Sequence, residues 1–224
     1  MCKAVVERTD PGGTIFPWPH WVGAWPQDEQ ERAARGAQDP LHPFRRGEGM
    51  RRIALDGTLD SLEVGTVVAT ICAYGAREEA GADEDADPTA ILRVLCERER
   101  VVVGGGIQVR VDDVVVLRPE CCCGLEGWRE WIAFANGGAQ PWAGHSPYPY
   151  VARPAAGMIA LGLTKDSAVQ VEAEALRAAL QSVEQDLVAF RALLRAWAHS
   201  VAPKIAERVV AKLDHDFQLT MPDA

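Results

Sequence analysis

The sequence lacks any run of about 20 apolar residues, the length that an α-helix needs to cross a bilayer. Basic residues are also scarce: 23 Lys and Arg stand against 32 Asp and Glu, which gives a formal net charge of −9. Nucleic acids and anionic membrane surfaces both bind basic patches. We therefore expect neither a nucleic acid nor a membrane as partner. An acidic surface suits a basic protein partner.

Familiar catalytic and targeting motifs are missing as well. The glycines at 104–106 lack the G-x-G-x-x-G spacing of a dinucleotide site, and no Gly-Lys-Ser/Thr follows them. The sequence contains no G-x-S-x-G nucleophile elbow and no H-E-x-x-H zinc motif. Its first residues, MCKAVVERTDPGG, lack the apolar segment of a secretory signal. We expect a cytoplasmic protein, and the missing motifs favour a role without catalysis.

Residues 1–50 predict a proline- and tryptophan-rich N-terminal arm. Prolines at positions 11, 17, 19, 26, 40 and 43 are incompatible with long helices and central strands. The candidate binding residues of this arm are Trp18, His20, Trp21 and Trp25. Exposed tryptophans are common anchors at protein interfaces. The same cluster is also suited to fixing the arm on the chain's own body, because each ring buries a large apolar area.

An α+β body is expected over residues 51–160. The run TVVATICA at 66–73 is short and rich in β-branched residues, which predicts a buried strand. Asp87 and Pro88 form a helix-start signal, so a short helix should follow. Three strand-like runs come next and predict a small antiparallel meander with tight turns at 104–106 and 112–113. These strands are expected at 101–103, 107–111 and 114–118.

Residues 161–224 predict a long helix and a short final one. From about Asp166 to His199, apolar residues recur at heptad spacings of four and three. This stripe consists of Val169, Ala173, Leu176, Leu180, Val183, Leu187, Phe190, Leu194, Trp197 and Val201. Pro203 ends the long helix, and a second helix follows. Small uncharged residues flank the stripe, which favours packing onto the body; a homo-oligomer through residues 169–201 is the alternative.

Three consecutive cysteines lie between a strand-like and a helix-like run, and they allow three interpretations. Cys121 and Cys123 would share one side of a strand and could bind zinc together with His145. Alternatively, Cys123 at a helix N-terminus could be an activated thiol with His145 as its base. The third interpretation, which we favour, is that Cys121, Cys122 and Cys123 are small apolar residues that pack between two elements.

Aromatic residues after the triplet complete the candidate binding surface. Trp128 lies on the helix-like run that starts near Gly124. Trp142, His145 and Tyr148 lie in the proline-rich loop at 141–154, and loops often carry binding sites.

The stretch EWIAFANGG at 130–138 resembles a segment of the SUKH superfamily. The matching residues are Trp131, Phe134, Asn136, Gly137 and Gly138. Members of this superfamily are mostly cytosolic bacterial immunity proteins that bind and block polymorphic toxins. The resemblance is confined to this stretch, and the long C-terminal helix and the Trp-rich arm depart from it. It implies an α+β body, no catalysis and an acidic face against a basic toxin.

The sequence thus predicts an α+β protein that binds a basic protein partner and has no cofactor, as an immunity-type inhibitor would. The competing hypothesis is a thiol- or metal-dependent enzyme that uses Cys121, Cys123 and His145, with zinc as the candidate metal.

Overall fold

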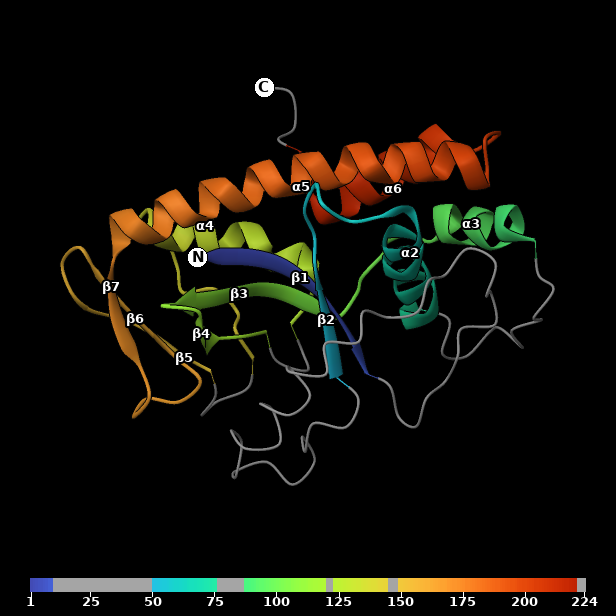
Figure 1. The fold of residues 1–224 in the computed structure, drawn as a ribbon. Coiled ribbons are helices and arrows are strands. Elements are labelled where there is room, and N and C mark those ends of the chain that lie inside the picture. Colours follow the sequence, from blue (N-terminus) through green and yellow to red (C-terminus); the bar gives the residue numbers. More distant parts are fainter. Residues whose placement is uncertain (10–49, 76–86, 120–122, 145–148, 221–224) are drawn as a thin grey trace.

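The computed structural model describes residues 1–9, 50–75, 87–119, 123–144 and 149–220 (Figure 1). The described helices are α2 (Ser61–Gly75), α3 (Pro88–Glu97), α4 (Trp128–Ala135), α5 (Ala173–Val201) and α6 (Ala206–Phe217). They pack with two antiparallel sheets, which confirms the predicted α+β class. Within the described ranges, no helix is long and apolar enough to span a membrane.

The larger sheet has the strand order β2-β1-β3-β4. Its strands are β1 (Cys2–Thr9), β2 (Met50–Ala54), β3 (Gly105–Val111) and β4 (Val114–Leu117). β1 pairs with β2 on one side and with β3 on the other. Ala4, Val5 and Val6 are all buried, as expected for a strand with both faces covered. α5 crosses over this sheet and contacts β1 (Figure 1).

The position of β1 corrects part of the predicted arm. Residues 2–9 form a central strand, although sequence analysis assigned them to an appendage. Thr9 pairs with Met50, so the chain leaves the sheet at Thr9 and returns beside it at Met50. The intervening segment is therefore inserted between two paired strands. Trp18, His20, Trp21 and Trp25 belong to it and lie outside the described residues.

The predicted strand at 66–73 is wrong, because these residues belong to helix α2. Asp60 Oδ1 accepts hydrogen bonds from the backbone N–H groups of Leu62 and Glu63. Glu63 Oε2 accepts one in return from the Asp60 N–H, which completes a capping box. Apolar side chains cover most of the helix circumference, so no helical period is visible in the sequence. The buried apolar residues are Val64, Val67, Val68, Ala69, Ile71 and Cys72.

The glycines at 104–106 form no turn, and residues 101–103 form no strand. Gly105 and Gly106 begin β3, while Gly104 bridges to Gly124. The Gly105 N–H donates to the Cys123 carbonyl at 3.1 Å. A Cβ on Gly105 would lie 2.2 Å from the Val5 carbonyl oxygen, so only glycine allows this approach of the backbones. The glycine run is thus brought beside Cys123, the last residue of the cysteine triplet.

The predicted turn at 112–113 is confirmed, with Asp112 at φ 48° and Asp113 at φ 61°. Val111 pairs with Val114 across it, so this is a two-residue hairpin turn with both central residues in the left-handed region. Such turns prefer glycine at the second position, since a Cβ is unfavourable there.

Replacing Asp113 with glycine is expected to raise the free energy of unfolding by about 0.5–1 kcal/mol, because it relieves the left-handed strain. Urea denaturation followed by far-UV circular dichroism measures the change. Asp113→Ala is the matched control: it removes the same carboxylate but keeps the Cβ, and it should give no such gain. Equal stabilisation by the two variants would assign the effect to charge and contradict the backbone argument.

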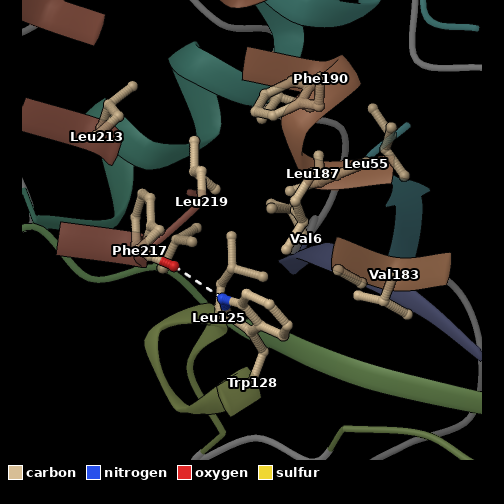
Figure 2. Packing of buried hydrophobic residues seen from close by; sticks show 14 of the residues in the cluster. Val6, Leu55, Leu125, Trp128, Val183, Leu187, Phe190, Leu213, Phe217 and Leu219 are labelled. Atoms are coloured by element: carbon tan, nitrogen blue, oxygen red, sulfur yellow. Dashed lines mark hydrogen bonds between the residues drawn. The ribbon is translucent and has the colours of Figure 1, made fainter. Parts of the chain in front are cut away.

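The long helix α5 starts at Ala173, later than predicted, because residues 169–172 form strand β7. β7 (Val169–Glu172) pairs with β6 (Met158–Gly162), which pairs with β5 (Tyr150–Ala155) in the smaller sheet. Within α5 the apolar stripe is buried against the rest of the chain, as the small flanking residues predicted. Its buried members include Leu176, Leu180, Val183, Leu187, Phe190, Leu194 and Trp197. Figure 2 shows Val183, Leu187 and Phe190 among them.

The predicted start of α3 is confirmed, and so is a second helix after Pro203, α6 (Ala206–Phe217). Asp87 Oδ1 accepts from the Thr89 N–H at 3.0 Å, with Pro88 at the first helical position. After Pro203, α6 turns back along α5 and buries Val209 and Leu213.

Candidate functional site

A pocket of about 290 Å³ opens where the end of β4, the 123–127 segment and α4 meet. Gly106 and Cys123 lie in its wall, next to Pro119. The lining side chains able to bind a ligand by charge or by stacking are Arg100, Arg118, Glu126, Glu130, Trp131 and Trp142. The pocket therefore combines carboxylates, guanidinium groups and aromatic rings.

Glu126 supplies a buried carboxylate to this pocket. Its side chain folds back over Gly124: a Cβ on that glycine would lie 2.1 Å from Glu126 Oε1. Glu126 Oε2 is buried and accepts no hydrogen bond within the described part of the chain. Leaving a buried acceptor unpaired costs about 1–3 kcal/mol. A cation placed in the pocket would lie beside this carboxylate and interact favourably with its charge.

Trp142 is held in an exposed position beside the pocket. Its side chain is 55% exposed, although its neighbours Pro141 and Ala143 are buried. The Trp142 N–H donates to Glu130 Oε2 at 3.0 Å, which ties this segment to α4. A large aromatic ring is thus presented to solvent from a backbone that is fixed on both sides. Little conformational entropy is lost when such a residue enters an interface.

Cys123 is the part of the cysteine triplet that the structure describes. Its side chain is only 7% exposed and packs near Gly106, and this burial agrees with the packing interpretation. Cys121, Cys122, His145 and Tyr148 lie outside the described residues. The thiol-enzyme and zinc hypotheses therefore stay predictions. Among the residues that the structure does describe, no three His, Cys, Asp or Glu side chains cluster so as to hold a metal ion.

Trp128 is a core residue, which corrects its assignment to the binding surface. Its side chain is completely buried, and its Nε1–H donates to the Phe217 carbonyl at 2.9 Å (Figure 2). This hydrogen bond joins α4 to the end of α6. Trp128 therefore contributes to stability and is not accessible to a partner.

The stretch that resembles the SUKH superfamily forms α4 and its C-terminal cap. Trp131 and Phe134 are buried. The Gly137 N–H donates to the Phe134 carbonyl and the Gly138 N–H to the Ala133 carbonyl, with Gly137 at φ 95°. This is a Schellman motif, as expected for Asn-Gly-Gly after a helix. Local helix termination accounts for these glycines.

Of the residues that line the pocket, Cys123 and Trp142 were predicted from the sequence as candidate site residues, whereas Glu126 and Glu130 were not. Acidic residues in the first turn of a helix are common because they interact favourably with its N-terminus. The positions of Glu126 and Glu130 in the sequence therefore did not indicate a binding site. Comparison with models of protein families, with curated proteins and with solved structures found no match.

Proposed function

We propose that this protein is a cytoplasmic, non-catalytic protein-binding module, of the kind that inhibits a basic partner as immunity proteins do. The observation that carries the proposal is Trp142, an exposed ring fixed beside a pocket that contains two carboxylates. Tryptophan is enriched among the residues that dominate binding energy at interfaces. Glu126 and Glu130 provide acceptors next to it, as contact with a basic surface requires.

The charge of the chain supports the same proposal. The net charge of −9 would attract a basic protein from a distance and raise the rate of association. Such steering weakens as salt is added, because screening shortens its range. We therefore expect the association rate constant to fall with ionic strength, while the dissociation rate changes less.

Replacing Trp142 with alanine is expected to weaken the partner complex at least 30-fold, equivalent to about 2 kcal/mol. The partner is first captured on the tagged protein in its host and identified by native mass spectrometry. Its affinity for each variant is then measured by surface plasmon resonance.

Leu62→Ala is the matched control, since Leu62 is 50% exposed but lies on α2, outside the pocket. It should bind the partner like the unchanged protein. Equal affinities of the Trp142→Ala and Leu62→Ala variants would contradict the proposed surface. A captured partner with an acidic surface would contradict the proposed charge complementarity.

A further inference from the structure

The size of the pocket suits one inserted side chain. Small-molecule sites usually enclose roughly 300–1,000 Å³. A volume of about 290 Å³ lies at the lower end of that range, so the pocket has room for a small ligand such as one long side chain. A single long side chain of a partner protein is small enough for this volume, and the partner's backbone would then lie at the rim of the pocket.

The buried carboxylate decides which charge that side chain carries. Glu126 Oε2 is buried, so solvent screens it less than it screens an exposed group. The pocket also contains two guanidinium groups: Arg100 is exposed to solvent, and Arg118 has an interaction within the protein although its Nε is buried without a hydrogen bond. An anion would be placed beside a desolvated carboxylate, whereas a cation with N–H donors would satisfy it. The favoured ligand is therefore a cation.

The exposed ring distinguishes between the two kinds of cationic side chain. Trp142 is 55% exposed, so part of its surface is available to a planar cation, and Glu130 has a second carboxylate oxygen beyond the one bound to the Trp142 N–H. A guanidinium group is planar, carries five donors and is less strongly hydrated than an ammonium group. It can stack on an indole while it donates to carboxylates, and an ammonium group lacks this geometry.

We infer that the pocket receives one arginine side chain of the partner, which donates to Glu126 and stacks on Trp142. This inference rests on the proposed function, because it supplies the chemical feature by which the partner is recognised.

Binding of three capped tripeptides to the full-length protein tests this inference. Ac-Gly-Arg-Gly-NH2 is compared with its lysine counterpart and with its citrulline counterpart, which keeps the planar shape but has no charge. The readout is the ¹H–¹⁵N signal of the Trp142 indole, assigned with Trp142→Phe. The arginine peptide should shift this signal saturably, and both other peptides should bind at least tenfold more weakly.

Glu126→Gln should reduce the affinity for the arginine peptide at least tenfold, because it removes the charge and keeps the shape. Glu172→Gln, on an exposed position of β7, is the matched control and should leave the affinity unchanged. If Glu126→Gln fails to fold, Glu126→Asp serves in its place, since it withdraws the carboxylate by one methylene group.

Equal binding of the arginine and citrulline peptides, equal binding of the lysine peptide, or an unchanged affinity in Glu126→Gln would each overturn the arginine assignment. The proposed function would survive that result if Trp142→Ala still weakened the partner complex. Selective arginine binding together with an unaffected partner complex would instead overturn the proposed surface.

Discussion

Replacing Trp128 with alanine is expected to lower the free energy of unfolding by about 3–5 kcal/mol, the usual range for a large aromatic residue deleted from a core. Trp128 is completely buried in the cluster that includes Leu125 and Phe217 (Figure 2). The substitution opens a cavity between α4, α5 and α6. It also removes the hydrogen bond to the Phe217 carbonyl. Urea denaturation monitored by far-UV circular dichroism gives the change directly.

Two further variants separate the contributions to this loss. Trp128→Phe keeps most of the buried ring but removes the donor, so it should lose about 1–3 kcal/mol through the unpaired carbonyl. Trp142→Ala makes the same substitution as Trp128→Ala at an exposed position and should change stability by no more than about 0.5 kcal/mol. A Trp128→Ala protein as stable as Trp142→Ala would contradict the assignment of Trp128 to the core.

Replacing Asp216 with alanine is expected to lower the free energy of unfolding by about 3 kcal/mol, because it breaks a buried charge pair and leaves its partners unsatisfied. The Asp216 side chain is only 3% exposed and lies 2.9 Å from Lys212 Nζ. Its Oδ2 accepts from the Val101 N–H at 2.7 Å. This carboxylate therefore fastens α6 to the segment that precedes β3.

The same group makes stability depend on pH. Burial raises the pKa of Asp216, but hydrogen bonds from His215, Lys212 and the Val101 N–H outweigh it, so the pKa lies below its ordinary value. A lowered pKa in the folded state contributes stability above the ordinary pKa of about 3.9. This contribution is lost as the pH falls through the lower, folded-state value. We therefore expect acid to destabilise the protein below about pH 4.

Asp216→Asn isolates this contribution, since it keeps the shape and an acceptor but cannot ionise. The difference in stability between the unchanged protein and Asp216→Asn should be largest near neutral pH and should shrink on acidification. Asp56 also has a lowered pKa, because burial is outweighed by hydrogen bonds from Thr58 and Lys3, so some acid sensitivity should persist in the variant. A difference that stays constant from pH 7 to about pH 2 would contradict the ionised state of Asp216.

The elements that were predicted correctly are those with signals in a few neighbouring residues. Asp87 and Pro88 mark the start of α3, and Gly137 marks the end of α4. The two aspartates of the β3–β4 turn and the apolar stripe of α5 are equally local. A cap, a turn or a helical face depends on backbone geometry within one or two helical turns, so its residues suffice to specify it.

Sequence alone did not separate a helix from a strand where a segment is buried on every side. Residues 66–73 were assigned to a strand because their apolar residues hide the helical period. The local signal was nevertheless present in the capping box of Asp60 and Glu63. At β7, Val169 and Val171 fit the alternation of a strand, but Val169 also fits the heptad stripe, so pairing with β6 decided the outcome.

The sequence by itself determined the α+β class, the helix caps, the hairpin turn and the face by which α5 packs. Only the tertiary structure decided that residues 2–9 form a central strand and that the Gly105 N–H donates a hydrogen bond to the Cys123 carbonyl. It also decided that Trp128 is buried while Trp142 is exposed. Strand pairing and burial join residues far apart in the chain. Two tryptophans with similar local sequence signals can therefore have opposite roles, because long-range packing determines which of them remains exposed to a partner.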